Sequence, residues 1–321
     1  MSIEKPPRSL RAYTWLTVGV AMLAGGFMAT QSRINGELSS RLGDPPLTAF
    51  ISFGSGTIIL LLFLTMSRRT QRGLGSIVLA IRERRVPWFY TLAGFAGASF
   101  VFSQSLVVGF TGVALFSITF VCGLTVGSFL LDALGIGPAG RRPFSSPRAV
   151  GVGLAVVAVT VSTLGSFGQI QSVVLLILPL TFGVLVAWQQ IANGTLAGIA
   201  RTPLAPTVVN FMVGSGVLAI LAGIYSLTAG LPDTYPVDWW LYLGGLCGVF
   251  FVSMTAWSVR HLGALVTSLA TTTGQILTAV IEDLLFPNAT VDFFSLFAGA
   301  GLMMLALVVA AFGWKRRPLA G

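Results

Sequence analysis

Two pairs of amide side chains stand four residues apart within largely apolar stretches of the chain. Gln31 and Asn35 form the first pair, and Gln189 and Asn193 form the second pair 158 positions later. Residues four apart lie on one face of a helix, so each pair presents two uncharged polar groups in one direction. Amides can bind a polar solute or bridge helices without the cost of burying a charge. We therefore weigh a solute pathway against a purely structural bond between helices.

Four more polar residues are candidates for the same pathway. Ser52 and Asn210 occupy equal positions in two related apolar stretches, and Gln104 lies in the middle of a third without a match later in the chain. Gln275 follows a glycine in a late apolar stretch. Polar side chains inside membrane segments often mark pathways, although hydroxyls there can simply bond the preceding turn of their own helix.

Three acidic residues could bind a coupling proton or cation at the rim of such a pathway. Asp132 and Asp283 fall at equal positions of a repeated pattern, and Glu282 precedes the second of them. The alternative, which we favour from sequence, is that these carboxylates sit at solvated helix ends.

The sequence contains little that an enzyme or a metal site would need. His261 is the single histidine, and Cys122 and Cys247 lie apart in apolar stretches. There is no C-x-x-C, H-E-x-x-H or G-x-S-x-G motif. We expect no cofactor, no bound metal and no catalytic residue.

The composition requires a membrane environment for these residues. Hydrophobic residues make up 55% of the 321 positions and charged residues only 9%, which leaves too little polar surface for a water-soluble domain. The net charge of +9 does not indicate nucleic-acid binding, because the arginines lie between apolar stretches. We expect an all-α integral membrane protein.

Ten apolar segments approach the roughly 20 residues needed to cross a bilayer. They are 13–32, 47–66, 87–109, 112–132, 148–166, 171–190, 205–229, 237–258, 262–284 and 291–313. The short links GFTG (109–112) and SFGQIQ (166–171) predict antiparallel hairpins. The first segment is long for a signal peptide, and its cleavage would remove part of the repeat described next.

The distribution of arginine and lysine orients the chain. Seventeen of the 19 fall in the termini and in alternate loops, and only Arg33 and Arg41 fall on the other side. By the positive-inside rule, both termini, 1–12 and 314–321, are cytoplasmic, which fits a bacterial inner-membrane protein. The segment 67–86 is basic and amphipathic, so we expect it to lie on anionic lipid.

The chain repeats itself. Gln31, Asn35, Pro45 and Phe53 match residues 158 positions later, and Trp88, Gly97, Gly123 and Asp132 match residues 151 positions later. The halves 13–166 and 171–313 hold five predicted spans each, an odd number, so the second half must be inverted in the membrane. In both halves the asparagine of the amide pair is followed directly by a glycine. We expect these glycines, Gly36 and Gly194, to cap or end their helices.

The motif Q-x-x-x-N-G-x-L … P … SFGSGT, with FLLDALG closing the fourth span, resembles the bacterial YdcZ-like family of the drug/metabolite transporter superfamily. The resemblance covers nearly the whole chain and implies two fused five-span units that form a transporter. GQILTAVIEDLLF keeps the family pattern in the second half, whereas the first half has Leu124 where the glutamine would be.

We therefore predict a secondary transporter that exports a small metabolite or amphiphilic compound by alternating access between inverted repeats. Its partners would be a small-molecule solute and the lipid bilayer, with no nucleic acid, as a monomer or a homodimer. A non-transporting scaffold or lipid scramblase is the alternative, and a membrane enzyme is less favoured. The substrate and the coupling ion stay open.

Overall fold

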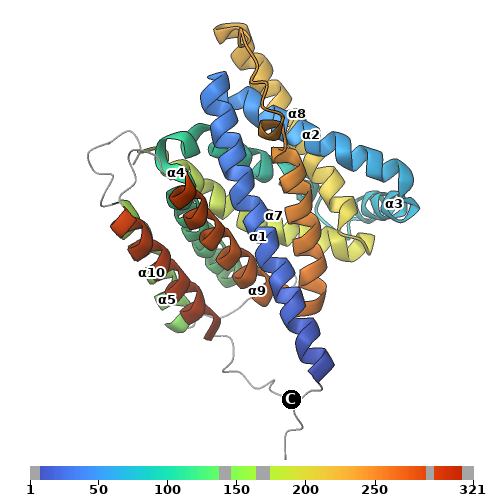
Figure 1. The fold of residues 1–321 in the computed structure, drawn as a ribbon. Helices are drawn as coiled ribbons and strands as arrows, with labels where there is room; N and C mark the ends of the chain where they lie inside the picture. The colour runs from blue at the N-terminus through green and yellow to red at the C-terminus, as the bar shows by residue number, and fades with distance from the viewer. Residues whose placement is uncertain (1–7, 137–145, 164–173, 287–292, 313–321) are drawn as a thin grey trace, which may run out of the picture.

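The described part of the chain is built from helices. The computed structural model describes residues 8–136, 146–163, 174–286 and 293–312, and these contain no strand (Figure 1). The long helices are α1 (Arg8–Leu42), α2 (Pro45–Met66), α3 (Arg68–Arg82), α4 (Gly94–Leu134), α5 (Ser146–Thr163), α7 (Ile177–Ala200), α8 (Leu204–Ala229), α9 (Gly244–Leu285) and α10 (Phe293–Phe312). The 3-10 helices η1 (Trp88–Ala93) and η3 (Trp239–Tyr242) lead into α4 and α9.

Three helical stretches are long and apolar enough to cross a membrane, judged by length and composition. They are Pro45–Met66, Trp88–Leu131 and Leu204–Ala229. Large apolar side chains such as Leu62 of α2 and Leu227 of α8 are exposed. Such a surface suits lipid better than water. The structure therefore supports a helical membrane protein, and the arrangement of ten spans stays a prediction.

The start of α2 shows how the sequence sets a helix boundary. Asp44 Oδ1 accepts a hydrogen bond from Leu47 N at 2.8 Å, and Pro45 and Pro46 occupy the first turn. Proline lacks an N–H that would be unpaired there, and the aspartate satisfies one of the free amides. The Asp44 cap and the two prolines together fix the start of α2 at Pro45.

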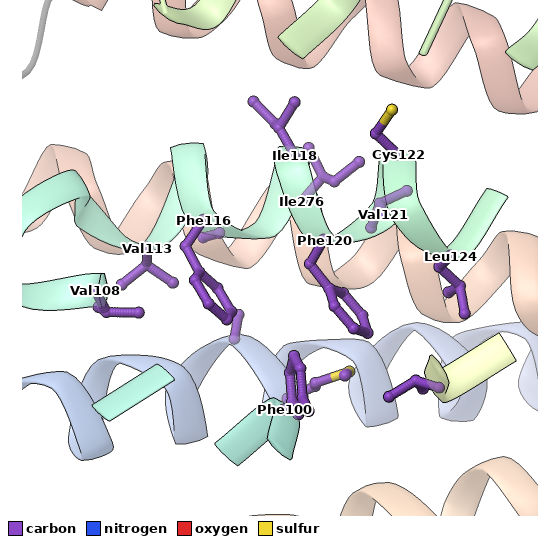
Figure 2. Close-up of a cluster of buried hydrophobic side chains, with 14 of the residues drawn as sticks. Phe100, Val108, Val113, Phe116, Ile118, Phe120, Val121, Cys122, Leu124 and Ile276 are labelled. Atoms are coloured by element: carbon purple, nitrogen blue, oxygen red, sulfur yellow. The ribbon is translucent and has the colours of Figure 1, made fainter. Parts of the chain in front are cut away.

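The helix α4 consists of two limbs joined at Gly112. This glycine has φ 76° and ψ 167°, a conformation that glycine adopts without steric cost. The ring centroid of Phe100, before the break, lies 4.3 Å from that of Phe120, after it, whereas a straight helix would separate them by about 30 Å. The chain therefore reverses, as the GFTG link predicts, and Phe100 faces Phe116 and Phe120 in the core (Figure 2). The link 166–171 lies outside the described residues.

The helix α9 reverses as well, because two distant parts of it contact the same stretch of α1. A Cβ placed on Gly248 would lie 3.1 Å from Gln31 Nε2. The neighbouring Thr30 donates its hydroxyl to Glu282 Oε1 at 2.7 Å. Residues 248 and 282 would be about 50 Å apart in a straight helix. The two limbs of α9 thus flank one part of α1.

Helices of the first predicted half pack mainly against helices of the second. α1 packs along α9, α7 along α4, α2 against α8, and α5 against α10 (Figure 1). Phe53 and Phe211 stack with ring centroids 4.8 Å apart, and Thr57 Oγ1 lies 2.6 Å from Ser215 Oγ. The largest cluster of buried apolar side chains contains residues of both halves, so it holds them together.

Neither Asn-Gly step ends a helix, so the sequence-based prediction for Gly36 and Gly194 is wrong. α1 continues to Leu42 and α7 continues to Ala200. At Gly36 the missing side chain lets α1 approach α4, because a Cβ there would lie 2.6 Å from Val108 Cγ1. Close packing, and not a left-handed turn, explains this glycine.

The basic segment 67–86 forms α3, which packs on the turn between α7 and α8. A Cβ on Gly73 would lie 2.8 Å from Thr202 Cγ2. Arg69 Nη2 donates a hydrogen bond to the carbonyl oxygen of Arg201, the left-handed residue that ends α7, at 2.9 Å. The predicted contact of this segment with anionic lipid stays a prediction.

Candidate functional site

A network of buried hydrogen bonds joins α1 to α4. Asn35 Nδ2 donates to Gln104 Oε1 at 2.9 Å, and Gln104 Nε2 donates to Ser32 Oγ at 2.7 Å. Ser32 donates in turn to the carbonyl oxygen of Met28 at 3.0 Å. Asn35, Gln104 and Ser32 have no exposed surface. Breaking one of these bonds would leave a polar group buried and unpaired, so the network holds the two helices together.

Glycines of α9 bring its backbone close to the other polar residues of this region. A Cβ on Gly244 would overlap Asn35 Oδ1 and lie 2.7 Å from Ser52 Oγ. One turn later, Gly248 makes the same room for Gln31. The structure thus groups four predicted pathway residues with Ser32, and we call the set the α1 amide cluster: Gln31, Ser32, Asn35, Ser52 and Gln104.

The second pair of amides lies on α7 in a more open environment. A Cβ on Gly97 of α4 would lie 2.8 Å from Gln189 Nε2, so Gln189 packs on a glycine as Gln31 does. Gln189 and Asn193 are nevertheless partly exposed. Asn210 of α8 is buried. The structure therefore leaves Gln189 and Asn193 more exposed than the α1 amide cluster, although Gln31 and Gln189 make a matching contact with a glycine.

Gln275 belongs to neither amide group. Its Nε2 lies 3.5 Å from Ser117 Oγ, at the outer limit of a hydrogen bond, and both residues are buried. Its backbone nitrogen faces Gly25 of α1. Gln275 thus lies where α9 packs between α1 and the second limb of α4.

Asp283 caps the second limb of α4. Its Oδ1 accepts a hydrogen bond from Val113 N at 3.1 Å, and its Oδ2 accepts one from Ala114 N at 2.8 Å. The break at Gly112 leaves these amides free, and the start of a helix favours a carboxylate. Asp283 is 2% exposed, so the favoured prediction of a solvated helix end is wrong for this residue.

Glu282 has unused bonding capacity within the described residues, as does Asp44, the α2 cap, whose Oδ2 is also buried without a partner. Glu282 Oε1 accepts the hydroxyl of Thr30, while its Oε2 is buried and has no hydrogen-bond partner in the part of the chain that the structure describes. The side chain of Asp132 lies outside the described residues. Within the described residues, no group of three His, Cys, Asp or Glu side chains could hold a metal ion.

Arg41 ties the end of α1 to the segment before η3. Its Nε donates to Glu37 Oε1 at 2.8 Å, and its Nη1 donates to Asp238 Oδ2 at 2.6 Å. The hydrogen bond to Glu37 is the main reason that the pKa of the Arg41 guanidinium is raised. These side chains are exposed, so solvent screens both ion pairs.

Sequence reasoning missed Ser32, Thr30 and Gly244 as parts of these contacts. Ser32 lies inside the Gln-x-x-x-Asn motif, and Thr30 stands directly before it. Their partners are 72 and 252 positions away along the chain. Gly244 directly precedes Gly245, which lies 151 positions after Gly94 and so follows the repeat, and this was a signal that could have drawn attention to it.

Comparison with known proteins places the chain in a family. One family model, described as "Putative inner membrane exporter, YdcZ", matches residues 16–161 and 174–312. Among solved structures 13 chains match, and one of these, described as "Crystal structure of protein", is 17% identical with a TM-score of 0.55 over 96% of this chain and 100% of that chain. At this identity the likeness shows the fold alone. No curated protein matches. Since the family model covers most of the sequence, the chain belongs to the YdcZ family of the inner membrane.

Proposed function

We propose that this protein is a secondary-active transporter that exports a small metabolite or amphiphilic compound by alternating access between two inverted five-helix halves. Membership of the family supports export across the inner membrane in general terms. One observation carries the proposed mechanism: residues at equivalent positions of the two halves make equivalent contacts. Such internal symmetry lets one half adopt the conformation of the other.

The packing of α1 on α9 is repeated by the packing of α7 on α4. A Cβ on Gly25 of α1 would lie 2.7 Å from Gln275 N, and a Cβ on Gly183 of α7 would lie 2.7 Å from Leu124 N. The two glycines are 158 positions apart, and their two neighbours are 151 positions apart. These are the two offsets of the sequence repeat, so the same helix crossing occurs twice.

The crossing of α2 and α8 relates the halves to each other directly. A Cβ on Gly56 would overlap the ring of Phe211, and a Cβ on Gly214 would overlap the ring of Phe53. Each residue of the pair is matched 158 positions away. Reciprocal contacts of this kind are what a twofold relation between two halves produces.

The directions of the helices support an inverted arrangement. The first limb of α9 runs antiparallel to α1, because Gly244 faces Asn35 and Gly248 faces Gln31. The second limb runs parallel to α1, because position 275 lies beside position 25 and position 282 beside position 30. Alternating directions with five spans in each half would place the equivalent ends of α1 and α7 on opposite sides of a membrane.

Uncharged amides and hydroxyls would form the solute pathway in this mechanism. The α1 amide cluster and the pair Gln189 and Asn193 offer hydrogen bonds without a fixed charge, which suits a polar or amphiphilic solute. Glu282 would carry the coupled proton, because one of its oxygens lacks a partner within the described residues and its side chain is largely removed from water. Asp283 would instead keep its capping role.

Solute flux in vesicles tests the proposal. Purified protein is reconstituted, solutes that shift its thermal stability are identified from a metabolite library, and countertransport of each is measured. We expect transport that Gln31→Ala and Asn193→Ala each reduce at least severalfold. Gln71→Ala is the matched control, since Gln71 is an exposed amide on α3, outside both amide groups.

The alternatives give different results in the same vesicles. A lipid scramblase would move labelled lipid between leaflets without any solute, and a scaffold would show neither activity. Transport that survives both Gln31→Ala and Asn193→Ala would remove the proposed pathway. Absence of countertransport for every stabilising solute would remove the transporter.

A further inference from the structure

Equivalent faces of α1 and α7 differ in how far neighbouring helices cover them. On α1, positions 31, 32, 35, 36 and 39 form one face, and all five are buried. On α7, the matching positions 189, 190, 193, 194 and 197 are partly or fully exposed. The neighbouring positions 38 and 196 are both buried, so α7 is not simply a peripheral helix. The difference is therefore confined to one face.

The face of α1 is covered because α1 packs on α4. Gly36 meets Val108, and Asn35 bonds to Gln104. By the repeat, the matching contact would join α7 to the first limb of α9. Within the described residues α7 has no comparable packing against α9, and a Cβ added to Gly194, the match of Gly36, would have no atom of another element within 4 Å. We call each of these two surfaces a gate: the α1 gate is closed, because α4 covers it, whereas the α7 gate is open, because α9 does not cover it within the described residues.

The residue that locks the closed gate has no equal in the other half. Gln104 reaches both Asn35 and Ser32. The position 151 residues later is Thr255, whose side chain is shorter and has no amide. Its Oγ1 is buried without a hydrogen-bond partner in the described part of the chain. A threonine cannot span two residues as an amide does. Gln190, which matches Ser32, supplies an amide on α7 instead, but this residue is exposed, so the second gate has no equivalent lock in this conformation.

We propose that Gln104 is the locking residue of the gate at the C-terminal end of α1, and that the absence of an amide at Thr255 makes the protein rest with the α7 gate open. This inference rests on the proposed transport mechanism. Because the arginines predict cytoplasmic termini, the closed gate lies toward the outer side and the open gate toward the cytoplasm. The resting protein is then ready to accept solute from the cytoplasm, the direction that export needs.

Thiol labelling from each side of the membrane tests this inference without a known solute. Ser39 and Ala197 are equivalent positions on the two faces, one buried and one partly exposed. Ser39→Cys and Ala197→Cys are exposed to a membrane-impermeant maleimide in right-side-out and in inverted membrane vesicles. The unsubstituted chain, whose Cys122 and Cys247 are buried, sets the background.

We expect Ala197→Cys to react from the cytoplasmic side and Ser39→Cys to react little from either side. Adding Gln104→Thr removes the lock and should raise labelling of Ser39→Cys from the outer side roughly three- to tenfold, the effect of about one net hydrogen bond on an equilibrium. Adding Thr255→Gln supplies an amide to the other gate and should lower labelling of Ala197→Cys by a similar factor.

Equal labelling of Ser39→Cys and Ala197→Cys would overturn the inference, and so would unchanged labelling of Ser39→Cys after Gln104→Thr. If Gln104→Thr does not fold, two results still test the inference. One is the comparison of labelling between Ser39→Cys and Ala197→Cys, and the other is the change that Thr255→Gln causes in labelling of Ala197→Cys. Labelling of both positions from one side would instead refute the inverted arrangement, and thus the proposed transport mechanism itself. Labelling as expected without any solute flux would leave the gates in place and refute only the transport activity.

Discussion

Replacement of glycine by alanine at the helix crossings should destabilise the protein, whereas the same replacement on the exposed surface of α8 should not. Gly25 and Gly183 are buried, and a Cβ on either would overlap a backbone carbonyl oxygen of the facing helix and lie 2.7 Å from a backbone nitrogen. Gly216 of α8 is exposed and has nothing within 4 Å of the added Cβ. The chemical change is the same at all three positions.

The size of the effect follows from two opposing contributions. Alanine favours a helix over glycine by up to about 1 kcal/mol at every position. At the crossings the added methyl must push two backbones apart, and overpacking of this kind costs about 1–3 kcal/mol or more. We therefore expect Gly25→Ala and Gly183→Ala to be less stable than Gly216→Ala by roughly 1–3 kcal/mol, which corresponds to roughly 2–10 °C in the unfolding midpoint.

Thermal unfolding of the purified variants in one detergent measures this difference. Gly216→Ala should unfold at or slightly above the temperature of the unsubstituted protein, and the two crossing variants should unfold below it. Similar losses at Gly25 and Gly183 would agree with equivalent crossings in the two halves. If Gly25→Ala were as stable as Gly216→Ala, the close approach of α1 and α9 on which the arrangement depends would be refuted.

Four further predictions follow from other contacts. Asp283→Asn should lower the free energy of unfolding by about 1–3 kcal/mol, since an amide can accept at only one of its two ends; stability equal to the unsubstituted protein would contradict the cap. Thr57→Val and Ser215→Ala should show a coupling of about 0.5–1.5 kcal/mol in a double-mutant cycle of unfolding, and additivity would contradict their contact. Glu282→Gln should abolish the response of solute flux to an imposed pH gradient and leave solute exchange intact; a normal response would exclude Glu282 from coupling. Arg41→Gln should leave the unfolding temperature unchanged at moderate salt, because its ion pairs are exposed, and a clear decrease would show that they stabilise the fold.

Local features of the fold could be predicted from sequence where short-range chemistry decides them. The link GFTG leaves no length for a loop, so the reversal at Gly112 followed directly from the sequence. The prediction of a helix end at Gly36 was wrong, because a glycine typical of a helix end also suits a close helix crossing. At Gly36 the neighbour that makes the difference is Val108, which is 72 positions away.

The candidate site was only partly predictable, because its residues meet through tertiary contacts. Gln31, Asn35, Ser52 and Gln104 were recognised as polar residues in apolar stretches, yet nothing in their spacing shows that Gln104 bonds to Asn35. The repeat predicts that the two halves share contacts. The repeat by itself cannot predict which half closes over its amides, because a pattern that both halves share is compatible with both conformations. The difference lies at Gln104, which the repeat does not match.

The contact between α2 and α8 has a consequence for motion. Phe53 stacks on Phe211, its own counterpart, and Thr57 meets its counterpart Ser215. A contact between counterparts maps onto itself when two halves exchange shapes, so it can persist while the paired surfaces elsewhere separate. The crossing of these helices would then serve as the fulcrum of a rocking movement, and substitutions there should alter the rates of opening toward both sides alike.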